Sequence, residues 1–292
     1  MNHLTKLSAL ALGTLLLTSS CENQQLTPSA PFGSSADQST QSGSLLFDDV
    51  TVTLAKKYTL VKDGNATLVY NSDGTLQKVM EGNRVTTYGY SPGKITTLTL
   101  VDGIKTEDGT YHLDASGRCT KAELRAYSKL ENGIPLTTLY YYYYQYDAKG
   151  RLTKRYGQID PDSRTEFTYN ADNNLVETKK YDHANNLLQK NTYEYQTVRG
   201  GSLIADKYRL NPMGIENMDP YLRIFGKTSK NLVLRLITTQ PVYGGINSDY
   251  RFSYSLNEDG YVTTRKKYAN TSGFLLETKP YDYLVSNPII NP

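Results

Sequence analysis

The sequence has few of the residues that most often carry chemistry. It contains no tryptophan, three histidines and two cysteines in 292 residues. A zinc site usually needs several histidine or cysteine ligands, and a histidine-based triad needs a nucleophile motif that this chain lacks. Lysine and arginine total 32 against 29 aspartates and glutamates, so the net charge is only +3, with both signs spread along the chain. We therefore expect no metal, no cofactor and no nucleic acid partner.

The first of the two cysteines follows a segment with the features of an export signal. Lys6 precedes the apolar stretch Leu7–Leu17, which is too short to span a bilayer as a helix. Small residues then lead directly to Cys21. This order resembles the lipobox of bacterial lipoproteins, and the resemblance implies that Cys21 is lipidated and becomes the mature N-terminus. The alternative is an ordinary secretory signal cut near Ser20, with Cys21 as a bystander.

Large apolar residues are scarce directly after Cys21. Residues 22–44 are mostly Gln, Ser, Thr, Pro, Gly and Ala, a composition that cannot bury enough surface to fold. We predict a lipoprotein signal peptide over 1–20, a lipid-anchored cysteine and flexible tether over 21–47, and a β domain over 48–288. The protein is then expected at the cell outer membrane, held by its N-terminal lipid and exposed at the surface or on the periplasmic face.

Tyrosine is abundant, at 26 positions, and many tyrosines are the first residue of a repeated sequence motif. In order, the motif consists of an aromatic or aliphatic residue, Asp or Asn, any two residues, Gly or Asn, any one residue and an apolar residue. The copies are Tyr70–Leu76, Leu113–Cys119, Tyr146–Leu152, Tyr169–Leu175, Tyr181–Leu187 and Leu256–Val262. Gly and Asn accept a positive φ at little cost, so each copy predicts a hairpin turn whose two end residues share a face. Cys119 closes its copy, so we expect a small core residue there.

Turn-forming pairs recur from residue 60 onward at intervals of about ten residues, enough for one strand and one tight turn. Strands joined by short loops are antiparallel neighbours. We predict an all-β fold, a long antiparallel up-and-down meander of about fourteen to sixteen strands that forms an extended twisted or partly closed sheet. In Thr75–Met80, alternation places Leu76 and Met80 on one face.

One irregular insertion interrupts this pattern near 210–231. The stretch Leu210–Asn231 contains prolines and methionines and lacks strand alternation. Long irregular segments often carry function, and the alternative is a plug that covers an open end or face of the sheet.

The stretch Tyr146–Arg155 (YDAKGRLTKR) resembles the tyrosine–aspartate repeat, also called YD or Rhs-like, of bacterial cell-surface proteins. Taken with the lipobox and the insertion, residues 55–285 resemble an uncharacterised domain family of Bacteroidota surface lipoproteins. The resemblance implies an architecture and an envelope location, and it supplies no catalytic residues. Large Rhs proteins build a closed shell from such repeats, but this chain is too short to enclose a cargo protein.

The run Tyr140–Tyr144 supplies candidate binding residues. Tyr146 opens a repeat, so its side of the strand should be packed. Tyr141 and Tyr143 then lie on the opposite face, where their rings could stack on a ligand, or where they are simply half-buried in a thin sheet.

The function expected from these features is non-enzymatic: a binding or scaffold protein of the envelope whose partner is a glycan, a peptide or another envelope component. One alternative is a polysaccharide-acting hydrolase that uses paired carboxylates such as Asp160, Asp162 or Glu166. Another is a structural spacer without a ligand.

Replacing Cys21 with serine should release the protein from membranes, because serine offers no thiol for the lipid. Partition between membrane pellet and supernatant measures this, with Cys119→Ala as the matched control that should stay in the pellet. Unchanged partition of Cys21→Ser would contradict the lipid anchor.

Overall fold

The computed structural model describes residues 56–129, 134–158, 160–196, 201–211, 218–241 and 245–286. Cys21, the predicted signal peptide and the predicted tether over 21–47 lie outside these residues. Across the described ranges, no helix has the length and apolar character needed to cross a membrane.

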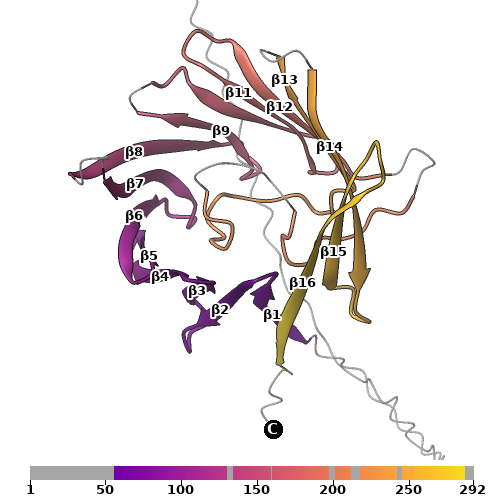
Figure 1. Cartoon of the computed structure of the whole chain (residues 1–292), viewed down its shortest axis with the longest axis horizontal. Coiled ribbons are helices and arrows are strands. Elements are labelled where there is room, and N and C mark those ends of the chain that lie inside the picture. Colours follow the sequence, from indigo (N-terminus) through magenta and orange to yellow (C-terminus); the bar gives the residue numbers. More distant parts are fainter. Residues whose placement is uncertain are drawn as a thin grey trace, which may run out of the picture. The chain divides into compact units, whose positions relative to one another are not determined.

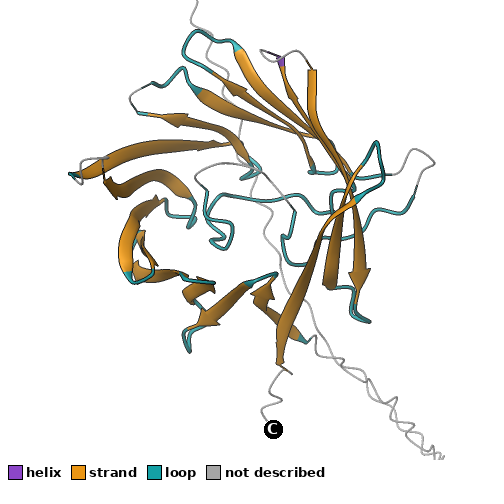
Figure 2. Cartoon of the chain, in the orientation of Figure 1, coloured by secondary structure: helices purple, strands orange, loops and turns teal. Residues whose placement is uncertain are grey.

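The described residues form sixteen β-strands, which confirms the all-β prediction (Figures 1 and 2). The strands are β1 (Lys57–Asp63), β2 (Ala66–Tyr70), β3 (Leu76–Glu81), β4 (Arg84–Ser91), β5 (Lys94–Val101), β6 (Ile104–Leu113), β7 (Cys119–Lys129), β8 (Pro135–Tyr146), β9 (Leu152–Gly157), β10 (Arg164–Tyr169), β11 (Leu175–Tyr181), β12 (Leu187–Glu194), β13 (Arg235–Gln240), β14 (Gly245–Leu256), β15 (Val262–Ala269) and β16 (Leu275–Ser286).

The strands close into a barrel. Each strand pairs antiparallel with its neighbours in sequence, and β1 pairs with β16 from Lys57↔Ser286 to Asp63↔Tyr281. The prediction of an extended twisted or partly closed sheet is therefore wrong. The physical reason is that the first and last strands would otherwise expose unpaired backbone groups, and their mutual pairing removes both edges.

All six repeat copies adopt one turn conformation. In each copy the first and last residues are Cα partners, as Tyr146 is of Leu152. The fifth residue donates its N–H to the carbonyl of the second, as Gly150 does to Asp147 at 2.9 Å. That fifth residue has a positive φ in every copy, at Gly74, Gly117, Gly150, Asn173, Asn185 and Gly260. The turn thus explains why only glycine and asparagine stand at this position.

Each copy also carries a register shift beside its opening residue. In the strand that follows Tyr70, the buried residues are Leu76 and Val79, three positions apart. The predicted pairing of Leu76 with Met80 on one face is therefore wrong, because an extra residue in a bulge changes the alternation.

Tyrosine hydroxyls bond the carbonyls of the residues that close the copies. Four such bonds measure 2.7 to 2.9 Å: Tyr90 to Leu76, Tyr146 to Cys119, Tyr195 to Leu175, and Tyr283 to Val262. The closing residue begins one strand, and the donor tyrosine lies on the next strand or, for Tyr195, directly after the end of that next strand. A buried carbonyl without a partner is unfavourable, so these phenols stabilise the bulged ends of the hairpins as well as filling space.

Described parts of the connection between β12 and β13 lie inside the ring of strands (Figure 1). Its described parts bond to inward-facing residues all around the barrel: Asp219 accepts from Tyr88 on β4, Ile224 accepts from the amide of Cys119 on β7, and Ser229 accepts from the amide of Leu175 on β11. The insertion is therefore a plug. We use this name for residues 201–211 and 218–234.

The plug completes the hydrophobic core. Leu232 and Val233 are 0% and 1% exposed, and the Phe225 ring lies 5.1 Å from that of Tyr144 and 6.1 Å from that of Tyr111. A sixteen-stranded barrel is too wide for its own side chains to fill. The plug supplies the missing apolar atoms at the end of the barrel where most repeat turns lie.

Gly226 offers a test of how the plug docks. Its φ is +77°, and an added Cβ would lie 2.6 Å from the Gly150 carbonyl oxygen and 2.8 Å from the Tyr146 ring. Gly103 has the same φ with no atom within 4 Å. In urea unfolding, Gly103→Ala should lose about 1–2 kcal/mol from backbone strain, and Gly226→Ala about 3–5 kcal/mol because steric overlap is added. Equal losses would contradict the docking of the plug against the β8–β9 turn.

Candidate binding surface on strands β6 to β9

The tyrosines of β8 divide between the two faces of the barrel wall. Tyr144 is 4% exposed in the core, and Tyr142 and Tyr146 pack against that core. Tyr141 and Tyr143 alternate with them and lie on the outer face, half-buried. The predicted orientation of the two candidate residues is confirmed, whereas their role in binding stays a prediction.

Neighbours on adjacent strands cover part of both rings. The Tyr143 ring stacks on that of Tyr156 from β9 at 5.5 Å, and its hydroxyl donates to Gln158 at 3.4 Å. The Lys121 ammonium lies 5.0 Å from the centre of the Tyr141 ring. These contacts are what a half-buried aromatic pair makes on a sheet, and both side chains remain partly exposed.

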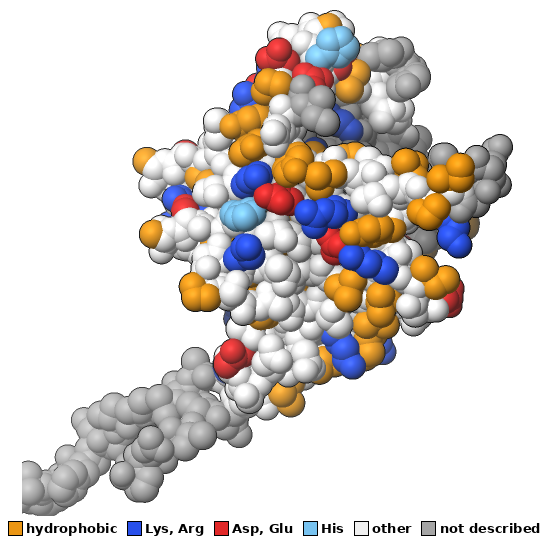
Figure 3. Space-filling model, turned by 90° about the vertical axis from the view of Figure 1, so that its left-hand side faces the viewer, with side chains coloured by type: hydrophobic (Ala, Val, Ile, Leu, Met, Phe, Trp, Pro, Cys, Tyr) orange, Lys and Arg blue, Asp and Glu red, His pale blue; other side chains and the backbone are white. Residues whose placement is uncertain are grey.

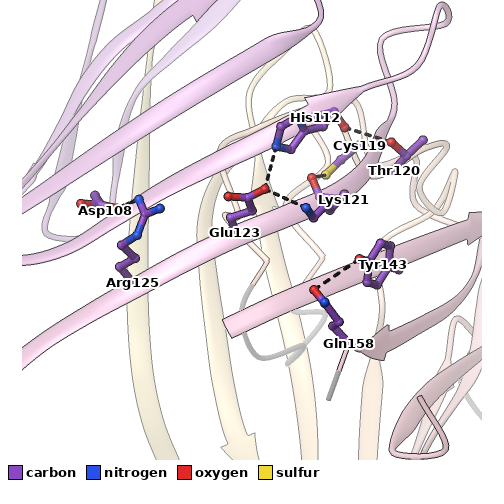
Figure 4. A network of polar contacts seen from close by, with 9 residues as sticks. All are labelled: Asp108, His112, Cys119, Thr120, Lys121, Glu123, Arg125, Tyr143 and Gln158. Carbon is purple, nitrogen blue, oxygen red and sulfur yellow. Dashed lines mark hydrogen bonds and ion pairs between the residues drawn. The ribbon is translucent and has the colours of Figure 1, made fainter. Parts of the chain in front are cut away.

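Charged side chains of both signs lie on this side of the barrel (Figure 3), and Figure 4 shows the polar contacts of Glu123 together with Tyr143. Glu123 on β7 accepts from Lys121 at 2.8 Å and contacts His112 on β6 at 3.2 Å. The hydrogen bond from Lys121 holds the pKa of Glu123 below its ordinary value. The carboxylate therefore stays ionised and neutralises the lysine, which suits this surface to hydrogen bonding more than to attracting a charged ligand.

A second polar group extends the surface toward the other end of β7. Asp108 on β6 accepts from Arg125 at 3.2 Å and from the Tyr127 hydroxyl at 2.7 Å. Burial opposes the ionisation of Asp108, but its hydrogen bonds, the largest from Lys105, outweigh burial and lower its pKa. We use "outer β6–β9 surface" for the outward side chains of both groups together with Tyr141 and Tyr143.

Two of the carboxylates considered for hydrolysis already have hydrogen-bond partners on β10 or in the loop before it. Glu166 is bound to Arg164 at 2.6 Å on the outer face of β10. Asp160 accepts from the amide of Ser163 in the loop before that strand. Within the described ranges no group of three or more His, Cys, Asp or Glu could hold a metal ion.

The Asp and Asn side-chain oxygens of the repeat turns accept hydrogen bonds from backbone amides of the same turn, as Asp147 does from the amide of Arg151 at 2.9 Å.

Cys119 is the free thiol of the described residues. It is 0% exposed, and burial raises its pKa to about 12. A protonated, inaccessible thiol is a poor nucleophile, so the expected core role of Cys119 is confirmed.

Sequence reasoning missed a pocket of about 490 Å³ at the plug end of the barrel. It lies between the turns at 149–151 and 173 and the plug segments 206–209 and 227–230. Most of its lining residues are basic. The cluster of lysines at 227–230 was a sequence signal, but nothing in the sequence shows that these residues meet a turn some eighty positions earlier.

The comparisons place the fold among solved structures. No protein-family model and no curated protein matches the chain. A porin-like protein from Bacteroides uniformis ATCC 8492 is 18% identical, with a TM-score of 0.54 over 80% of this chain and 98% of that chain. A porin-like protein from Bacteroides vulgatus ATCC 8482 is 13% identical, with a TM-score of 0.55 over 80% of this chain and 100% of that chain. These likenesses establish a shared fold. The resemblance to YD-repeat surface lipoproteins is not shown by any family match and stays a prediction.

The two faces of β8 should differ in their contribution to stability. Replacing Tyr141 and Tyr143 together with alanine should lose about 1 kcal/mol, because only partly buried cross-strand contacts disappear. Tyr144→Ala, the matched inward control, should lose about 3–5 kcal/mol because it opens a cavity beside Phe225. Urea unfolding measures both. A loss in the double variant as large as that of Tyr144→Ala would show that the outer pair belongs to the core.

Proposed function

We propose that this is a lipid-anchored protein of the cell envelope with a non-catalytic binding or scaffold role. The barrel acts as a filled scaffold and not as an open channel. The observation that carries the proposal is the plug, whose residues Leu232 and Val233 are buried among side chains from around the barrel wall. An interior filled in this way supports a role in presenting surfaces more than a role in passing solutes.

The charged residues on the outer face of the barrel wall support the proposal that this face is exposed to water and not to lipid. Outward ion pairs occur on several strands, including Lys179 with Glu177 in the middle of β11, and Arg235 at the start of β13 with Asp249 on β14. On a lipid-facing wall, each lysine or arginine near the bilayer centre would be unfavourable by about 2–4 kcal/mol. Membrane attachment would then come from the lipid on Cys21 and not from the wall.

The proposed location is the outer membrane, on the surface or on the periplasmic face. The fold shared with porin-like proteins of two Bacteroides species and the resemblance to Bacteroidota surface lipoproteins both support it. The outer β6–β9 surface, with Tyr141 and Tyr143, is the proposed contact for a glycan, a peptide or an envelope protein, because partly exposed rings beside balanced charges can stack and hydrogen-bond.

Thiol labelling in native membranes tests whether the wall faces water. Glu166 points outward between the buried residues Thr165 and Phe167, and its side chain is 41% exposed. In membranes whose vesicles have been opened, Glu166→Cys should react fully with a membrane-impermeant maleimide. The unmodified chain is the control, since Cys119 is buried and should react only after denaturation.

Protection of Glu166→Cys in membranes, followed by labelling once detergent is added, would overturn the proposal. That result would place the wall in lipid.

A further inference from the structure

We propose that the pocket at the plug end of the barrel binds a small polyanion that carries two or more phosphate groups. This names a ligand class for the binding role above and rests on that role. Thiol labelling tests the environment of the wall, whereas ligand titration tests the pocket, so either idea can fail while the other stands.

The pocket concentrates positive charge. Six cationic side chains line it, against the single carboxylate of Asp206: Lys149, Arg151, Lys207, Arg209, Lys227 and Lys230. In the whole chain the two signs nearly balance, at 32 to 29. The excess at the pocket is therefore a local feature of the fold, and a concave basic site raises the local concentration of anions.

The one carboxylate is already engaged. Asp206 accepts from the amide of Leu210 at 2.9 Å and from the amide of Asn211 at 3.2 Å. Burial also raises its pKa. Asp206 thus organises the loop that carries Lys207 and Arg209, and it is one carboxylate among six cations.

Most of these cations lack a counter-charge among the described residues. Arg151 is paired with Asp147 at 2.7 Å, and the Lys207 ammonium donates to the Asp259 carbonyl oxygen at 2.5 Å. The other four cations form no ion pair with a described residue; they are Lys149, Arg209, Lys227 and Lys230. On the outer wall, by contrast, cations such as Lys121 and Arg235 have carboxylate partners. Neighbouring like charges repel one another, and a bound anion would relieve the repulsion.

The backbone beneath the cations is fixed before any ligand arrives. The amide of Lys227 bonds the Gly150 carbonyl at 2.9 Å, and the amide of Asp206 bonds the Lys230 carbonyl at 2.8 Å. Ser229 is 4% exposed and accepts from the amide of Leu175. A site whose segments are tied to the barrel loses little conformational entropy on binding.

The lining and the size of the pocket narrow the ligand. Asn173, Thr228 and Ser229 add hydrogen-bonding groups, and no aromatic ring is among the lining residues. A neutral sugar would find no ring to stack on, whereas phosphate oxygens match lysine and arginine donors. The volume of about 490 Å³ lies within the range of small-molecule sites and exceeds the need of one phosphate. The phosphates could belong to a soluble polyphosphate compound or to a phosphorylated lipid headgroup.

Isothermal titration of the full-length protein in a non-ionic detergent tests the site with tripolyphosphate as the probe. The double variant Lys227→Gln and Lys230→Gln removes two exposed ammonium groups from the lining. It should weaken binding by about tenfold or more, because charge-assisted hydrogen bonds are lost. The charge-matched control replaces Lys129 and Lys266, both exposed outside the pocket, with glutamine and should stay within about twofold of the unmodified chain.

A second titration uses a short-chain diacylglycerol pyrophosphate, a lipid whose headgroup carries two phosphates, below its micelle concentration. Binding of tripolyphosphate alone supports a soluble polyphosphate ligand, and binding of both probes with the same loss in the double variant supports a lipid headgroup. Absence of tripolyphosphate binding at millimolar concentration would overturn the proposal. Equal weakening in the two double variants would overturn it as well, since only general charge attraction would remain. Thermal unfolding of both variants checks that the fold is retained.

Discussion

The pairing of β1 with β16 is the interaction on which the rest of the structure depends. It turns a meander with two exposed edges into a ring with none. The ring fixes the width of the interior, and sixteen strands make that interior wider than the wall's own side chains can fill. The β12–β13 connection fills the space at one end, so a long irregular segment that would be unfavourable on a surface becomes part of the core.

The local features of the fold were readable from the sequence because they depend on backbone conformation within a few residues. A positive φ, as at Gly74 or Asn173, favours glycine or asparagine, so the turns could be located before the strands. Closure could not be predicted in this way. Nothing in the residues of β1 or β16 marks them as partners, since each strand resembles its neighbours and the contact joins positions more than two hundred residues apart. The bulges were missed because strict alternation was assumed after each turn.

The same division holds for the candidate sites. The outward position of Tyr141 and Tyr143 follows from alternation within one strand. Their partners Lys121 and Tyr156 follow from the strand register, which the sequence leaves open. The basic pocket is the feature that is hardest to predict from the sequence, because it combines two hairpin turns with two parts of the plug. Each part alone has the composition of an ordinary solvated loop, and the charge excess exists only once the plug is in place.

Closure of the barrel also brings its first and last strands together. Lys57 and Ser286 are paired residues, so the barrel begins and ends at one spot on its rim. A short peptide could join these two points, and the chain could then be cut at a hairpin elsewhere, giving a circular permutant with the same contacts. For the same reason the entire barrel could be inserted into a loop of a host protein without separating the two sides of that loop.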